Sequence, residues 1–192
     1  QIQMSMLQQG GSAYQQGQQY TLWAKVRPAR TVGGDLYAYQ QLDDGRLFLA
    51  VGDVSDKGVP AALFMAKAIS LIQQFSQSTD QPSRILNAVN NALEQGNDNC
   101  MFVTLFIGIL DTRTLQLQFA SAGHTEPMLV RQNCSLIVEQ QSGPALGLAP
   151  DLEFPSNQIQ LYKGDRLAIY TDGIDEAFNG ANEMFGHERL SA

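Results

Sequence analysis

The sequence predicts an α+β fold, namely an αββα sandwich in which two antiparallel β-sheets pack face to face and helices flank them. Short segments that are apolar, or that alternate between apolar and polar residues, recur along the chain and are separated by turn dipeptides, as is typical of antiparallel strands. Two helical segments follow one another directly between these strand runs, so the strand–helix alternation of a parallel sheet is absent. Helices grouped in this way cover an outer face of one of the sheets.

Length and composition indicate one globular domain. The 192 residues suffice to bury a core without disulfides, and 44% of them are hydrophobic. The net charge is −7 and no stripe of Lys and Arg occurs, so neither nucleic acid nor an anionic membrane surface is an expected partner. Apolar runs stay below the ~20 residues that span a bilayer, so no membrane insertion is expected. Cys100 and Cys134 lack metal-binding spacing, which fits a reducing, cytoplasmic location.

The first 19 residues differ in composition from the rest of the chain. They are rich in glutamine, and their large apolar residues ahead of the first glycine pair are Ile2, Met4, Met6 and Leu7. We interpret residues 1–19 as a linker helix or N-terminal tail, and residues 20–192 as the folded domain.

Strands are predicted from residue 20 onward. The segments TLWAKVRP, DLYAYQQL and GRLFLAVGD are short and apolar or alternating. The residues LDDG at 42–45 are a turn signal between the last two segments, which predicts a β-hairpin.

Two helices are predicted over residues 59–75 and 82–93. The first has Pro60 in its first turn, where a missing N–H is tolerated, and Ser55 or Asp56 as a candidate cap. Apolar residues recur at helical spacing in both segments. They are Ala62, Leu63, Ala66, Ile69 and Ile72 in the first helix and Ile85, Leu86, Val89 and Leu93 in the second.

The chain returns to strands after these helices. MFVTLFIGILD, TLQLQFASAGH, EPMLVRQ and SLIVEQ are all strand-like. QIQLYKGDRLAIYTDG is predicted to form a further hairpin with Lys163, Gly164 and Asp165 as its turn. Residues 174–192 then become helical in places.

Three aspartates share one sequence context. Asp35, Asp53 and Asp172 each lie at the end of a predicted strand and next to a glycine. Carboxylate oxygens suit Mg²⁺ or Mn²⁺, so convergence of these strand ends would create a site for two cations. Each aspartate alone could equally be a turn or helix-capping residue, and the repeated context is what favours the metal site. Asp43 and Asp44, in the predicted turn, are interpreted as solvated.

Six segments together carry a resemblance to a known family. In its order and spacing the series resembles the bacterial metal-dependent serine/threonine phosphatases of the PP2C superfamily (PPM), in the RsbU/SpoIIE-like branch. The resemblance runs from about Ile2, where IQMSML is similar to that branch's linker helix, to the end of the chain. The segments are RPARTVGGDLY, FLAVGDVSDKGVPAALFMA, MFVTLFIGILD, FASAGHTEPMLV, GPALGL and LAIYTDGIDEA.

The resemblance implies an αββα sandwich that holds two Mn²⁺ or Mg²⁺ ions between its sheets. Asp53 would bridge both metals, the Val54 backbone carbonyl and Asp35 would bind the second metal, and Asp172 would bind the first. Two cations lower the pKa of a shared water and offset charge on a phosphoryl group during in-line displacement. The neighbouring glycines would let the backbone approach the metals without a Cβ. These are Gly33, Gly34, Gly52 and Gly173.

The chain departs from the family pattern at the proton donor. Eukaryotic members carry a histidine after the bridging aspartate, whereas Ser55 stands there in this chain, and a serine is no useful acid at neutral pH. His124 is one substitute acid, and the competing interpretation is a polar residue that ends a strand and fixes the next loop. The family's phosphate-binding arginine has no certain counterpart. Arg27, Arg30 and Lys57 are candidates, each of which is equally explained as a surface charge.

A second departure lies at the end of the chain. The family carries a further metal-binding aspartate in a segment similar to DDITLL, and this sequence ends at GHERLSA before it. The resemblance therefore implies that a C-terminal strand and helix are missing. Asp172 alone would then hold the first metal weakly, unless Asp175 or Glu176 completes the site. An unpaired strand position would favour self-association, which leaves a homodimer open.

Two function classes follow from the resemblance. One is a phosphatase that removes phosphate from a phosphoserine or phosphothreonine of a partner protein, typically a STAS-type anti-sigma-factor antagonist in partner-switching signalling. Its N-terminal helix would connect to an upstream sensor or receiver domain. The other is a catalytically weak or inactive binding module of the same fold. A structural domain with incidental acidic residues would bind no cation.

Overall fold

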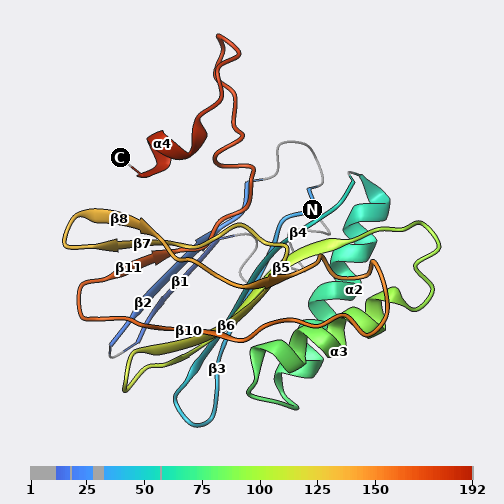
Figure 1. Ribbon diagram of the computed structural model, residues 1–192, viewed down its shortest axis with the longest axis horizontal. Helices are drawn as coiled ribbons and strands as arrows, with labels where there is room; N and C mark the ends of the chain where they lie inside the picture. The colour runs from blue at the N-terminus through green and yellow to red at the C-terminus, as the bar shows by residue number, and fades with distance from the viewer. Residues whose placement is uncertain (1–11, 18, 28–32, 57, 192) are drawn as a thin grey trace.

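A six-stranded β-sheet runs through the middle of the molecule (Figure 1). The structure is a computed structural model that describes residues 12–17, 19–27, 33–56 and 58–191. The strand order is β10-β6-β5-β4-β3, all antiparallel, and β9 pairs in parallel with β6. The strands are β3 (Leu36–Gln41), β4 (Leu47–Val54), β5 (Val103–Asp111), β6 (Gln116–Ala122), β9 (Ser142–Gly143) and β10 (Asn157–Gln160).

Two smaller sheets pack on one face of this sheet. Phe106 and Phe119 of the larger sheet stack with ring centroids 5.2 Å apart, and they share an apolar cluster with Leu129 of β7, Leu22 of β2 and Leu167 of β11. This packing confirms the predicted pair of face-to-face antiparallel sheets. The smaller sheets consist of β11 (Arg166–Ala168), β7 (Met128–Arg131) and β8 (Cys134–Ile137), and of β1 (Ser12–Gln16) and β2 (Thr21–Lys25).

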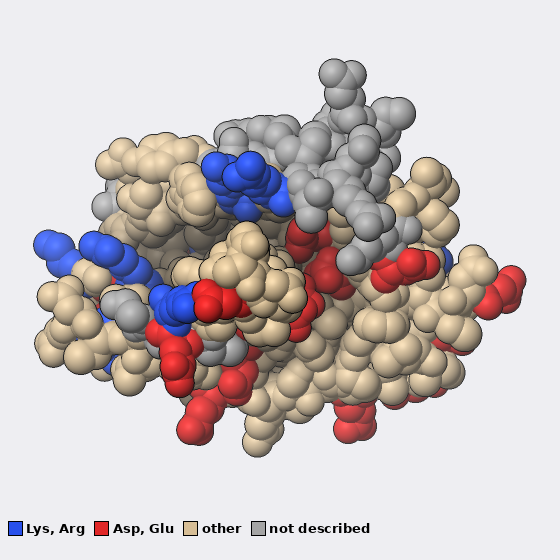
Figure 2. All heavy atoms as spheres, turned by 90° about the horizontal axis from the view of Figure 1, so that it is seen from above, with Lys and Arg blue, Asp and Glu red and all other residues tan. Residues whose placement is uncertain are grey.

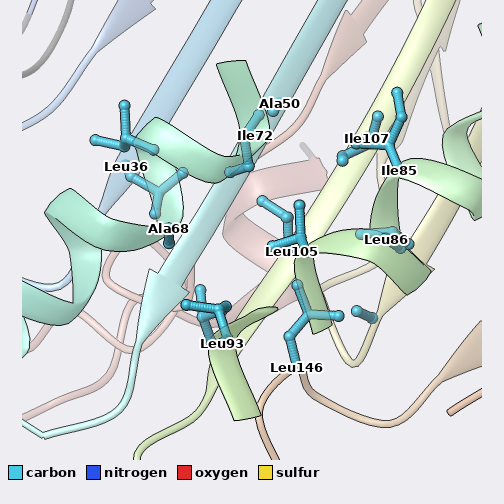
Figure 3. Close-up of a cluster of buried hydrophobic side chains, with 14 of the residues drawn as sticks. Leu36, Ala50, Ala68, Ile72, Ile85, Leu86, Leu93, Leu105, Ile107 and Leu146 are labelled. Carbon is cyan, nitrogen blue, oxygen red and sulfur yellow. The ribbon is translucent and has the colours of Figure 1, made fainter. Parts of the chain in front are cut away.

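The helices α2 (Val59–Ser76) and α3 (Pro82–Glu94) cover the other face of the six-stranded sheet (Figure 1). Their buried side chains form one apolar cluster with β3, β4 and β5 (Figure 3). A short third helix, α4 (Gly186–Ser191), lies apart from this layer near the C-terminus (Figure 1). The labelled members of the cluster are Leu36, Ala50, Ala68, Ile72, Ile85, Leu86, Leu93, Leu105, Ile107 and Leu146.

Both long helices lie where the sequence predicts them, and α2 differs in how it begins. Its N-cap is Gly58, with φ of 88°, and no side chain caps it within the described part of the chain, so the predicted cap at Ser55 or Asp56 is wrong. The Ser55 hydroxyl instead accepts a hydrogen bond from the Phe102 N–H at 2.9 Å. No helix among the described residues is long and apolar enough to cross a bilayer.

The buried face of α2 also differs from the predicted one. Leu63 is 66% exposed, whereas Ala61, Met65 and Ala68, which were not predicted, are fully buried against the sheet. Ile69 and Ile72 are buried as predicted. The predicted face was misassigned because nearly every residue from Val59 to Ile72 is apolar, so the helical spacing selects no single stripe. The face of α3 was predicted correctly, because its polar residues alternate clearly with Ile85, Leu86 and Val89.

Part of the predicted N-terminal segment is extended. Residues 1–11, where the linker-helix prediction falls, lie outside the described residues, but β1 forms a hairpin with β2. Tyr14 lies directly opposite Trp23, and both side chains are largely exposed, while Leu22 and Ala24 face the core. The residues of TLWAK alternate between exposed and partly buried, as expected for a strand with one face against the core.

The predicted hairpin around Lys163–Asp165 is wrong, although the turn itself exists. The Asp165 N–H donates to the Tyr162 carbonyl at 3.0 Å, and Gly164 has φ of 94°. The strands on either side belong to different sheets, because β10 pairs with β6 and β11 pairs with β7. The turn therefore carries the chain from one layer of the sandwich to the other.

Candidate metal centre

The β3–β4 hairpin brings Asp35 and Asp53 to the same edge of the larger sheet. Leu36 pairs with Gly52, so the next residues outward, Asp35 and Asp53, lie opposite each other in the antiparallel register. The hairpin turn is at the lower edge of Figure 1, and this aspartate edge is therefore at the upper one. Both carboxylate-bearing residues are half-buried.

Gly34 places the Asp53 carboxylate and the Val54 carbonyl side by side. A Cβ added at Gly34 would lie 2.6 Å from Asp53 Oδ1 and would overlap the Val54 carbonyl oxygen. The Val54 N–H donates to the Gly34 carbonyl at 3.2 Å, which holds the two segments together. The absence of a Cβ at Gly34 therefore allows its backbone to lie close to Asp53 Oδ1 and to the Val54 carbonyl oxygen, and Asp35 is the next residue along the chain.

These oxygens suit a divalent cation. Carboxylate and backbone carbonyl oxygens are the ligands that Mg²⁺ and Mn²⁺ bind, and Mg²⁺ needs only one or two carboxylates because it keeps several waters. The arrangement of Asp35, Asp53 and the Val54 carbonyl around Gly34 fits such an ion.

Asp172 stands on the other side of the sandwich. It follows β11, is exposed, and begins a turn in which its carbonyl accepts a hydrogen bond from the Glu176 N–H at 2.8 Å. Within the described residues, no three His, Cys, Asp or Glu side chains lie close enough together to hold a metal ion. The structure thus brings Asp35 and Asp53 together and leaves Asp172 outside any such cluster.

Asp43 and Asp44 lie in the hairpin turn at the opposite end of β3 and β4, as predicted. The Asp44 carboxylate pairs with Arg46 at 2.6 Å, and Arg46 also pairs with Asp80. A hydrogen bond from the Arg46 backbone N–H is the main cause that lowers the pKa of Asp44. Asp44 and Asp80 thus belong to a surface ion network around Arg46, away from the aspartate edge.

His124 is buried where the two sheets meet. Its Nδ1 lies 3.2 Å from Thr104 Oγ1, and its backbone carbonyl accepts hydrogen bonds from Gln140 Nε2 and Ser121 Oγ. Burial lowers the pKa of His124 to about 4, and the adjacent backbone of Tyr170 offsets only part of that effect. The neutral ring and the loop contacts favour the interpretation of His124 as a loop-fixing residue over that of an acid.

Thr104 is a residue that sequence reasoning missed. It pairs with Asp53 in the β4–β5 register, and its hydroxyl lies 3.5 Å from the Asp53 carbonyl. A threonine inside an apolar strand carries no motif, so only the register identifies it. Of the candidate phosphate-binding cations, Arg27 is exposed after β2, and Arg30 and Lys57 lie outside the described residues.

Figure 2 looks down on the end of the sheets that is uppermost in Figure 1. Some acidic side chains lie near the middle of this face, with Lys and Arg side chains beside them, and other acidic side chains lie toward its rim.

The fold is that of the PP2C-like domains. The family model for stage II sporulation protein E (SpoIIE) matches residues 43–192, and the chain belongs to this family. The chain is 33% identical to protein IcfG of Synechocystis over 90% of its own length and 32% of that protein's. It is 30% identical to the phosphoserine phosphatase RsbU of Bacillus subtilis over 78% of its length and 44% of RsbU. The chain thus spans less than half of these relatives.

Solved structures agree with this assignment. The RsbU and RsbW domains of a Mycobacterium tuberculosis protein match with a TM-score of 0.70 and 30% identity, over 79% of this chain and 42% of that one. The SiaA PP2C domain of Pseudomonas aeruginosa matches with a TM-score of 0.77 over 99% of this chain and 76% of that one, and its 21% identity supports the fold alone. RsbX, solved in complex with magnesium, shares the fold with a TM-score of 0.66 and 20% identity, over 85% of this chain and 79% of that one.

Proposed function

We propose that this chain is a metal-dependent protein serine/threonine phosphatase. Its substrate would be a phosphoserine or phosphothreonine on a partner protein, and a STAS-type anti-sigma-factor antagonist in partner-switching signalling is the partner we infer. Family membership supports the reaction class. The observation that carries the proposal is the meeting of Asp53 Oδ1 and the Val54 carbonyl at Gly34, with Asp35 beside them.

Asp35, Asp53 and the Val54 carbonyl would hold one Mn²⁺ or Mg²⁺ ion, and Asp53 and Asp172 would hold a second. When bound, such ions supply activation of water and neutralisation of phosphoryl charge. Gly34 contributes by leaving space where any side chain would displace the ligand oxygens. The half-buried position of Asp53 strengthens its attraction for a cation, because the effective dielectric constant is lower there than in bulk water.

The exposure of the edge suits a phosphoryl group carried by another protein. Asp172 is exposed, and Asp35 and Asp53 are half-buried, so a residue on a partner's surface can reach them. RsbU and RsbP of Bacillus subtilis are both named phosphoserine phosphatases, which supports this substrate class. The proposal sets the reaction in the cytoplasm, where the free cysteines Cys100 and Cys134 would stay reduced, under control of an upstream sensor or receiver domain.

Asp53→Asn tests the proposal. The amide keeps the size of the side chain and removes the charge that would serve both cations. We expect the variant to remain folded by circular dichroism, to lose calorimetric Mn²⁺ binding, and to lose Mn²⁺-dependent hydrolysis of a phosphoserine peptide.

Asp43→Asn is the matched control, because it makes the same substitution at the opposite end of the same hairpin. It should leave Mn²⁺ binding unchanged. Equal Mn²⁺ affinity in Asp53→Asn and the unsubstituted chain would refute the metal assignment. Intact Mn²⁺ and partner binding without any hydrolysis would instead support the alternative function, a binding module of phosphatase fold.

A further inference from the structure

His124 takes no part in the chemistry proposed above, yet it lies between the two aspartate-bearing parts of the fold. It is 5% exposed and follows β6, at the point where the chain leaves the larger sheet for β7 of the smaller one. Its neighbours belong to the larger sheet and to the segment after β11. The inference drawn from them rests on the proposed function.

One contact reaches toward Asp53. Thr104 Oγ1 lies 3.2 Å from His124 Nδ1, and Thr104 is the residue that pairs with Asp53 across β4 and β5. The same hydroxyl is 3.5 Å from the Asp53 carbonyl. His124 is thereby attached to the strand pair that carries the proposed bridging aspartate.

The other contact reaches toward Asp172. The backbone of Tyr170 lies next to the His124 ring, where it favours the charged form, and the Tyr170 side chain is itself buried at 5% exposure. Tyr170 precedes Asp172 by two residues and follows β11, which belongs to the smaller sheet. His124 therefore lies near the segment that leads to Asp172 as well as near the strand pair that carries Asp53.

We propose that His124 is a positioning residue that fixes the Asp172 segment against the Asp53 edge, through Thr104 on one side and the Tyr170 backbone on the other. It does not donate the proton to the leaving group. The turn that begins at Asp172 is exposed, and Tyr170, two residues earlier, is the buried residue that leads into it.

Thr104 Oγ1 lies between the ring and the Asp53 strand, 3.2 Å from His124 Nδ1 and 3.5 Å from the Asp53 carbonyl. The hydroxyl either accepts from Nδ1–H while it donates to the Asp53 carbonyl, or donates to Nδ1, so the ring is linked to Thr104 in both tautomers. Nε2 is buried and makes no hydrogen bond within the described residues. The lowered pKa agrees with a ring that stays neutral.

The test compares His124→Phe, which keeps a flat ring without nitrogen atoms, with His124→Gln, which keeps an amide donor. Calorimetry with MnCl₂ should show that His124→Phe binds Mn²⁺ about 10- to 100-fold more weakly than the unsubstituted chain, which is the loss typical of residues that orient metal ligands. His124→Gln should bind Mn²⁺ more tightly than His124→Phe does. Thr104→Val should weaken Mn²⁺ binding in the same direction, and Thr104→Ser should restore it. The double variant His124→Phe/Thr104→Val should be no weaker than His124→Phe, because both changes break one connection.

Three outcomes overturn the inference. The inference is wrong if His124→Phe is folded and keeps its Mn²⁺ affinity while Asp53→Asn abolishes Mn²⁺ binding. If neither variant changes Mn²⁺ binding, the proposed function is wrong as well. Loss of one limb of the pH–kcat profile in His124→Gln would make His124 an acid rather than a positioning residue. If His124→Phe does not fold, unchanged Mn²⁺ affinity in Thr104→Val decides against the inference.

Discussion

Gly34 determines how closely two backbone segments and a carboxylate can approach one another. Gly34→Ala introduces a Cβ 2.6 Å from Asp53 Oδ1 and against the Val54 carbonyl, and the carbonyl cannot move without shifting β4. Forced overpacking of this kind costs typically about 1–3 kcal/mol. We expect a lower melting temperature and weaker Mn²⁺ binding, measured by calorimetry in the same sample.

Gly180→Ala is the control for this prediction. An added Cβ at Gly180 meets no atom within 4 Å, so the substitution should change neither melting temperature nor Mn²⁺ affinity. If Gly34→Ala is folded and binds Mn²⁺ as tightly as the unsubstituted chain, then Mn²⁺ binding does not need the close approach of the Gly34 backbone to the Val54 carbonyl and Asp53.

Individual residues were predictable where local sequence carried the signal. Asp35 and Asp53 were found together because both flank strands of one short hairpin, whose register follows from the turn at 42–45. Gly52 is required by the sheet itself, since an added Cβ would lie 2.6 Å from the Thr104 carbonyl of β5, and its predicted place beside the metals stays a prediction. Thr104 itself was unpredictable, because its role depends on pairing with a strand about 50 residues away.

At the scale of elements, α3 anchors the loop that follows β9. The Asn90 side chain is fully buried, accepts a hydrogen bond from the Gly147 N–H and donates one to the Ala149 carbonyl, both at 2.9 Å. Leu146, in the same loop, exchanges backbone hydrogen bonds with Val103, the residue paired with Val54. One buried asparagine thus links the helix layer to the strands behind the aspartate edge.

Asn90→Ala should destabilise the fold by about 1–3 kcal/mol, because it leaves buried backbone groups of residues 147 and 149 without partners. Urea denaturation followed by circular dichroism measures the loss. Asn87→Ala is the matched control on the same helix: Asn87 is exposed, so its substitution should leave the midpoint nearly unchanged. Equal midpoints for the two variants would contradict the anchoring role of Asn90.

Elements were predicted well where pattern and turn chemistry agree. The predicted bounds of α2 and α3 differ from the observed ones by one residue at the C-terminal end. The turn at 163–165 was recognised, but its strands pair with β6 and β7 rather than with each other. A turn signal fixes a reversal of the chain and not its hydrogen-bonded partners, which depend on which apolar faces must be covered.

At the scale of the whole molecule, the buried His124 couples stability to pH. Its pKa is about 4 in the folded chain, against an ordinary value of 6.5 when unfolded. Between these values the unfolded chain binds more protons, so the free energy of unfolding rises with pH through this window. The stabilisation is present above pH 6.5 and is lost as pH falls toward 4, by a total of about 3 kcal/mol.

Denaturation midpoints measured across that pH range test this linkage. His124→Gln, which does not titrate there, should flatten the slope. The pKa of Asp165 is also lowered, first by its hydrogen bond to the Arg131 side chain. Asp165 changes the free energy of unfolding only at pH values near and below its ordinary pKa of 3.8, so its effect is separate from that of His124. An equal slope in the chain with and without His124 would mean that the pKa of His124 is the same in the folded and the unfolded chain.

The hairpin of β1 and β2 also decides which spectroscopic signals report folding. Trp23 is the single tryptophan of the chain and is 68% exposed, so its fluorescence already resembles that of a hydrated indole before unfolding. Its emission therefore reports the solvent around β2 and changes little when the core melts. Tyr37, Tyr39 and Tyr170 are buried, and their absorbance follows the loss of the core instead. The same chain thus carries separate optical probes for its outer surface and its interior.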